Sequence, residues 1–102
     1  MHIAYIDLHE ELRALNAQQD ALAAVSLWFY PSEKTDGVFE SEFYIVRFET
    51  VGYAGGVHYS DGSTHISGLI TATQAFNGLV QAAEFNYQNA LRRVAREPTE
   101  ES

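Results

Sequence analysis

The sequence contains no cysteine, a single lysine and only two prolines. The lack of cysteine excludes a disulfide framework, a thiolate zinc site and a cysteine nucleophile. No basic patch that could release counterions from a phosphate backbone is visible, so we expect no direct binding to nucleic acid. No apolar run approaches the roughly 18 residues of a membrane span, and the first residues do not resemble a signal peptide. We therefore expect a cytoplasmic protein with no membrane partner.

The chain is instead rich in acidic and aromatic side chains. Fourteen Asp and Glu residues against six Lys and Arg give a net charge of −8, and nine of the acids lie in residues 1–51. The hydrophobic content of 46% and the aromatic content of 13% are typical of a chain that folds. A length of 102 residues suits one modest core. We expect a single domain over residues 1–97 and a disordered acidic tail over residues 98–102.

Two segments have the three- and four-residue apolar spacing of an amphipathic helix. The first covers residues 7–24, with Asp7 as its N-cap. The second covers residues 71–97, with Thr71 as its N-cap. Gly78, inside the second helix, costs about 1 kcal/mol relative to alanine, and we interpret it as a point of close packing on a sheet.

The strands are expected between these helices. Residues 25–30 and 39–50 are β-branched and aromatic, and both segments are apolar on both sides in the middle, so both faces should contact something. Residues 2–6 form either a short edge strand or a lead-in to the first helix. The segments 31–37 and 51–56 are predicted to be loops, and neither matches a phosphate-binding glycine motif.

The stretch "VHYSDGSTHIS", residues 57–67, predicts a β-hairpin with a two-residue type I′ turn at Asp-Gly. That turn would place His58 opposite His65 and Val57 opposite Ile66. Two imidazoles on one face can bind a transition metal, but zinc requires a third or fourth ligand and none is evident. We therefore expect a polar face directed to solvent or to a partner, with His58 and His65 only weak metal candidates.

Together these elements predict an α+β domain of order α-β-β-β-β-α. An antiparallel sheet of three to four strands would have both helices packed on one face. Trp28 and Tyr30 would then remain on the uncovered side, together with either Phe43 or the set that includes Tyr44. Clustered exposed aromatic side chains usually mark an interface; burial by loops and the N-terminal segment is the alternative. Phe85 lies off the apolar stripe of the second helix and is a candidate dimer contact.

These features favour a non-enzymatic interaction protein without a cofactor, which binds another macromolecule through an acidic and aromatic surface and self-associates as a homodimer. Its acids suit a basic nucleic-acid-binding protein. By size and charge the chain resembles phage and mobile-element accessory proteins, which include anti-CRISPR inhibitors and nucleic-acid mimics. The expected partner-binding residues are Trp28, Tyr30, Glu33, Asp36, Glu40, Glu42, Tyr44, Glu49, His58 and His65.

Two other functions stay open. One is a ligand-binding regulatory module with an aromatic pocket between sheet and helix, which would contain a concave apolar cavity with few polar groups. The other is a small metal-dependent enzyme centred on His58 and His65, which would need a further ligand or acid near the pair.

Overall fold

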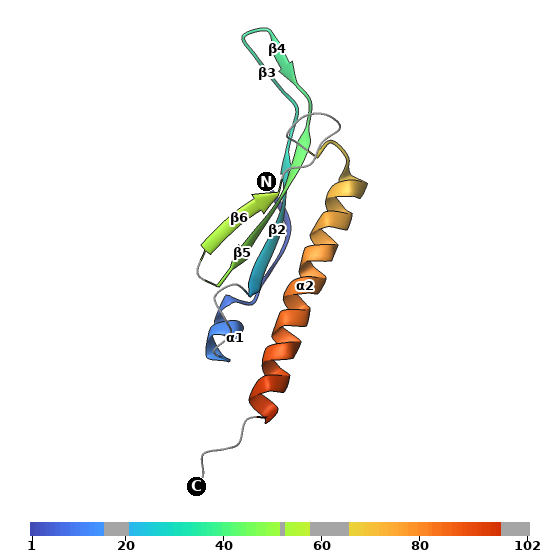
Figure 1. Ribbon diagram of the computed structural model, residues 1–102. Coiled ribbons are helices and arrows are strands. Elements are labelled where there is room, and N and C mark those ends of the chain that lie inside the picture. The colour runs from blue at the N-terminus through green and yellow to red at the C-terminus, as the bar shows by residue number, and fades with distance from the viewer. Residues whose placement is uncertain (16–20, 52, 58–65, 97–102) are drawn as a thin grey trace.

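The computed structural model describes residues 1–15, 21–51, 53–57 and 66–96. Within these ranges the chain has the predicted α+β fold, with a four-stranded antiparallel sheet of order β1-β2-β5-β6, a two-stranded sheet β3-β4 and two helices (Figure 1). Neither helix is long and apolar enough to cross a bilayer. The elements are β1 (His2–Asp7), α1 (His9–Ala14), β2 (Leu22–Tyr30), β3 (Glu33–Thr35), β4 (Val38–Glu40), β5 (Phe43–Thr50), β6 (Tyr53–Val57) and α2 (Leu69–Arg96).

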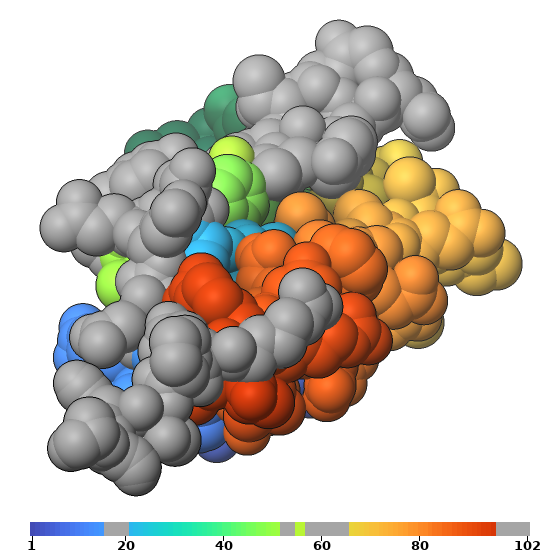
Figure 2. All heavy atoms as spheres, turned by 60° about the horizontal axis from the view of Figure 1, so that its bottom comes forward, coloured from blue at the N-terminus to red at the C-terminus, as the bar shows by residue number. Residues whose placement is uncertain are grey.

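The main core lies between α2 and one face of the four-stranded sheet. Val25 and Leu27 from β2 and Val46 from β5 are buried there with Ile66 and Ala72. Side chains two apart in a strand share a face, which places these strand residues together against the helix. The orange and red atoms of α2 lie directly against the cyan atoms of β2 in Figure 2.

A second, smaller cluster holds α1 against the same side. Leu12 of α1 is fully buried and packs with Ala23 of β2 and Ala90 of α2. The predicted helix over residues 7–24 is therefore too long, because α1 ends at Ala14 and Leu22 already begins β2. Leu22 lies at a helical spacing from the leucines before it, but β2 pairs with a strand on each side, and this pairing determines its structure.

The start of α1 also differs from the prediction. The N-cap residue is Leu8, which makes no side-chain capping bond. Asp7 is the last residue of β1, and its Oδ1 accepts a hydrogen bond of 2.9 Å from the backbone N–H of His9. The ambiguous N-terminal segment is thus an edge strand.

The strands β2, β3, β4 and β5 together form one long hairpin. Tyr30 pairs with Phe43, and the same register continues beyond the sheet where Glu33 pairs with Glu40. Pro31 separates β2 from β3, because proline has no N–H to donate to the ladder. We call residues 31–42 the arm; it projects from the sheet at the top of Figure 1.

The tip of the arm is a tight turn, so the prediction of a loop over residues 31–37 is wrong. Asp36 and Gly37 both have positive φ, 52° and 78°, as a type I′ turn requires. Asp-Gly is a strong hairpin signal, and here it lies between two three-residue strands. Each strand has only three residues, and any alternation within them is too brief to stand out in the sequence.

The prediction of a loop over residues 51–56 is also wrong, because Tyr53–Val57 is the edge strand β6. Gly55 lies opposite Phe48 of β5. A Cβ atom on Gly55 would lie 3.1 Å from the ring of Phe48. The glycine therefore leaves space for an aromatic ring on the neighbouring strand and does not form a turn.

The predicted hairpin over residues 57–67 is described only at its two ends. Val57 pairs with Val46, and Ile66 forms a bridge with Tyr44, so both ends pair with β5 and the expected pairing of Val57 with Ile66 is not formed. His58 and His65 lie outside the described residues, as do residues 98–102.

The helix α2 begins at Leu69, two residues before the predicted N-cap Thr71, and the N–H of Ala72 donates to the carbonyl of Gly68. Ala72 and Ala83 are fully buried where the helix meets the rest of the fold. Gly78 is exposed, and a Cβ atom there would meet nothing within 4 Å. It is not a point of close packing, contrary to the prediction.

Candidate functional site

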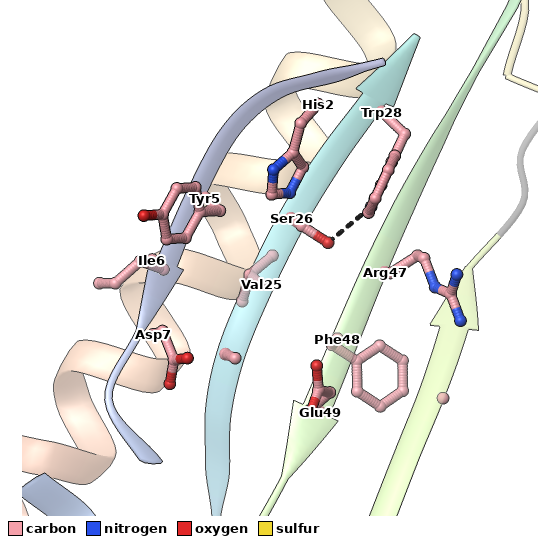
Figure 3. A pocket seen from close by; sticks show the side chains of 12 residues that line it. His2, Tyr5, Ile6, Asp7, Val25, Ser26, Trp28, Arg47, Phe48 and Glu49 are labelled. Carbon is pink, nitrogen blue, oxygen red and sulfur yellow. Dashed lines mark hydrogen bonds between the residues drawn. The ribbon is translucent and has the colours of Figure 1, made fainter. Parts of the chain in front are cut away.

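The face of the sheet opposite α2 is not covered by any described element. The strand pairs on this face are Trp28 with Ile45, Ser26 with Arg47 and Ala24 with Glu49. These pairs alternate along the two strands with the pairs that face the core. Figure 3 looks onto this face, with α2 behind the strands. We call it the open face; its members from β1, β2 and β5 are His2, Tyr5, Asp7, Ala24, Ser26, Trp28, Tyr30, Phe43, Ile45, Arg47 and Glu49.

A bulge in β1 adds two rings to the open face. The register between β1 and β2 shifts between His2 and Ala4, so His2 pairs with Trp28 while Tyr5 pairs with Ser26. His2 and Tyr5 consequently share a face although their spacing of three would normally separate them. Their rings stack 5.1 Å apart and 7° from parallel, and the ring of His2 lies 4.3 Å from that of Trp28.

Two further contacts fix the aromatic side chains of the open face. The indole Nε1 of Trp28 donates a hydrogen bond of 2.8 Å to the hydroxyl of Ser26 (Figure 3). The rings of Tyr30 and Phe43 stack 4.9 Å apart and 8° from parallel. Trp28, Tyr30, Phe43 and Ile45 are half-buried, while Tyr5 is 67% exposed. A band of ordered aromatic surface therefore crosses three strands.

Beyond this band the open face is hollowed and charged. A hollow of about 420 Å³ is lined by Trp28 at one end and by Asp7, Arg47 and Glu49 at the other (Figure 3). The Arg47 guanidinium makes no hydrogen bond or ion pair with any described residue. It is therefore available to an anionic group of a partner.

His9 and Glu49 join α1 to the edge of this hollow. The Nε2 of His9 lies 3.1 Å from Oε1 of Glu49. The other ring nitrogen, Nδ1, is buried and has no hydrogen-bond partner in the described part of the chain. No three His, Asp or Glu side chains within the described ranges lie close enough to hold a metal ion. His9 and Glu49 thus link two elements, and no third side chain in the described part of the chain completes a metal site with them.

The arm continues the open face as a charged and partly apolar projection. Glu33 lies directly opposite Glu40, and like charges in that position repel. Near the tip, Val38 and Phe39 are 68% and 66% exposed. Apolar side chains at the end of a projecting hairpin gain nothing from the core of their own chain, so a partner would be needed to bury them.

The structure separates the predicted partner-binding residues into four groups. Trp28, Tyr30 and Glu49 lie on the open face, whereas Tyr44 does not: it packs against the main core and its ring lies 5.1 Å from that of Phe29. Of the two alternatives for the uncovered side, the structure selects Phe43. The exposed acids Glu33, Asp36, Glu40 and Glu42 belong to the arm, Phe85 is 62% exposed on α2, and His58 and His65 lie outside the described residues.

His2, Tyr5 and Arg47 are among the open-face residues that were not predicted. His2 and Tyr5 were missed because the bulge in β1 reverses the alternation between them, and a bulge leaves no mark in so short a segment. Arg47 lies between apolar residues of β5, and the alternation of this strand places it opposite Ser26. The position of Arg47 on the Trp28 side could have been recognised from that alternation.

Comparison of the chain with protein-family models, curated proteins and solved structures gives no match, so function is argued from the open face itself.

Proposed function

We propose that this chain is a non-enzymatic interaction protein that binds a protein partner through the open face. The observation that supports this proposal is the uncovered band of Tyr5, Trp28, Tyr30 and Phe43, on a sheet whose other face is packed against α2. An aromatic patch on one side of a small domain is typical of contact surfaces, where tyrosine and tryptophan supply much of the binding energy.

The chemistry of the band suits a protein surface. The indole N–H of Trp28 is already bonded to Ser26, so a partner can cover the ring without supplying an acceptor. Polar groups border the rings, with Arg47 and Glu49 on one side and the arm on the other. An apolar centre with a polar rim is the usual composition of a protein interface.

The charge of the chain favours a partner that carries basic groups. The arm contains four acids and one lysine, in a protein of net charge −8. Such a field attracts basic surfaces and raises the rate of association at low salt. Proteins that handle nucleic acids carry basic surfaces, so an inhibitor or nucleic-acid mimic directed at them is the class of interaction protein that we favour.

The test is retention of a partner by matched variants. The wild-type chain, the double variant Trp28→Ala/Tyr30→Ala and the variant Phe85→Ala are immobilised and exposed to an extract of the cells that make the protein. We expect a partner that binds wild type and Phe85→Ala equally, binds the double variant at least about tenfold more weakly, and is released as salt increases. A partner that binds all three alike would refute the proposal.

A second candidate function rests on the hollow beside Trp28. A volume of about 420 Å³, bordered by aromatic rings and by Arg47, has the size of a small-molecule site. A ligand with a flat ring and an anionic group would stack on Trp28 and pair with Arg47. A thermal shift caused by such ligands in wild type, and lost in Arg47→Ala, would favour this function over protein binding.

A further inference from the structure

We infer that the partner of the open face is a second copy of this chain, bound antiparallel about a two-fold axis that passes close to residue 29. This inference rests on the proposed function, because it identifies a protein that covers the open face; Glu33 and Glu40 lie on the other side of the arm and stay exposed to a basic partner in the dimer. It is argued from the register of the long hairpin, from the distribution of charge along it and from the size of the surface.

The two ladders of the long hairpin share one register on either side of residues 31–32 and 41–42, and this extends the open face onto the arm. The pairs of β3 with β4 keep the register of β2 with β5. By strand alternation, Lys34 and Phe39 therefore belong to the same side as the pair Trp28 and Ile45. Glu33 and Glu40, one residue out of step, belong to the other side. The open face thus ends in the only lysine of the chain, and the opposed acids of the arm are directed away from it.

Charge is distributed asymmetrically along this extended face. Lys34 lies on the arm, whereas Asp7 and Glu49 flank Ala24 at the far end of the sheet, and Arg47 lies between them and the aromatic rings. Lys34 and Ala24 are both five residues from Phe29 in the sequence. A two-fold axis near residue 29 therefore places Lys34 of each copy between Asp7 and Glu49 of the other. A parallel arrangement would instead oppose like charges.

The same axis places the aromatic part of the open face of one copy against the same part of the other copy. Residues 28 and 30 lie on either side of residue 29, so the stacked rings of Tyr30 and Phe43 in one copy lie over Trp28 and Ile45 in the other. Two sheets that pack face to face bury side chains of this kind about 10 Å apart. A self-complementary patch is what a two-fold dimer requires.

The area is that of a modest interface. The strip from Ala24 to Thr35 is about 40 Å long at 3.3 Å per residue. In the antiparallel arrangement the sheet end of each copy faces the two-stranded arm of the other, so the shared width is about 10 Å at 4.8 Å per strand. A footprint of about 400 Å² is about half of the 800 Å² or so that each partner of a standard interface buries, which suits a weak dimer.

The inference is tested by a charge-reversal cycle in sedimentation equilibrium, with the wild type, Lys34→Glu, Glu49→Lys and the double variant Lys34→Glu/Glu49→Lys. We expect the wild type to reach twice its 11.4 kDa mass at micromolar to submillimolar concentration. Each single reversal should raise the dissociation constant of the dimer about tenfold, because a symmetric dimer brings the like charges together at two places. The double variant should recover most of this loss. Thr35→Glu, which adds an acid on the other side of the arm, is the matched control and should have little effect.

Other outcomes overturn the inference and separate it from the proposed function. A wild type that remains monomeric at about 1 mM refutes the second copy, while loss of an external partner in Trp28→Ala/Tyr30→Ala would still support the open face as a binding surface. If Trp28→Ala/Tyr30→Ala still forms the dimer and Phe85→Ala does not, the interface lies on α2 and the inference is refuted. If the losses of dimerisation free energy caused by Lys34→Glu and Glu49→Lys add in the double variant, Lys34 and Glu49 do not face each other, and the antiparallel arrangement is refuted.

Discussion

Tyr30 and Phe43 are the last paired residues of the sheet before Pro31, and their rings stack 4.9 Å apart. This pair marks the junction between the sheet and the arm. One side of the long hairpin carries these rings, and the opposite side carries the core residues that contact α2. The open face and the core are thus alternate residues of the same two strands.

The stack should contribute to stability as a coupled pair. Tyr30→Ala and Phe43→Ala should each destabilise the fold, and the double variant should lose less than the sum of the two, by about 0.5–1.5 kcal/mol. Urea unfolding of the four proteins at a concentration that keeps them monomeric measures this coupling. Strict additivity would show that the rings do not interact in solution.

Two glycines should respond in opposite directions to alanine. Gly37 has a φ of 78°, where a side chain is strained, so Gly37→Ala should destabilise the arm by about 1 kcal/mol. Gly78 is exposed in α2 with open space around it, so Gly78→Ala should stabilise the helix by a similar amount, about 1 kcal/mol. Thermal and urea unfolding of both variants check the signs. If both variants change the free energy of unfolding in the same direction, either the turn at Gly37 or the exposed helical position of Gly78 is wrong.

The neighbouring glycines of β6 provide a second matched pair. A Cβ atom on Gly55 would lie 3.1 Å from the Phe48 ring, whereas the nearest atom to one on Gly56 would be 3.9 Å away. Gly55→Ala should therefore be less stable than Gly56→Ala. Phe48→Leu, which removes the ring, should reduce the difference between them. If the two alanine variants are equally stable, the ring does not lie against Gly55.

The short helix α1 depends on a single buried side chain. Leu12 is fully buried against Ala23 and Ala90, and a six-residue helix has little stability of its own. Leu12→Ala should cost about 2–5 kcal/mol. Amide hydrogen exchange should show faster exchange in α1 and in the last half of α2. A loss below about 1 kcal/mol would mean that this cluster is loosely packed.

The sequence was sufficient for the parts of the fold that have long periodic patterns. The apolar stripe of α2 and the β-branched run of β2 identified the helix and the central strand, and the alternation of Trp28 and Tyr30 placed them opposite the core. These patterns persist over enough residues for one period to dominate. The helix at residues 7–24 was overestimated because leucine spacing is shared by short helices and strand ends.

The rest depended on contacts that spacing does not encode. The strand β6 contains two adjacent glycines and becomes a strand only because β5 pairs with it. The bulge that brings His2 beside Tyr5 is set by pairing with β2. Arg47 could have been assigned to the open face, but the hollow around it needs β1 and β5 together. Tertiary pairing, and not local preference, formed this site.

The central claim is that the open face is covered by a second copy, and Trp28, the only tryptophan of the chain, reports on it directly. Acrylamide quenching of its fluorescence should be measured from low micromolar to near-millimolar protein concentration, with Phe85→Ala as the control. We expect the quenching constant to fall at least about twofold as the dimer forms, with the same fall in Phe85→Ala. A quenching constant that stays unchanged over the whole range would contradict the claim.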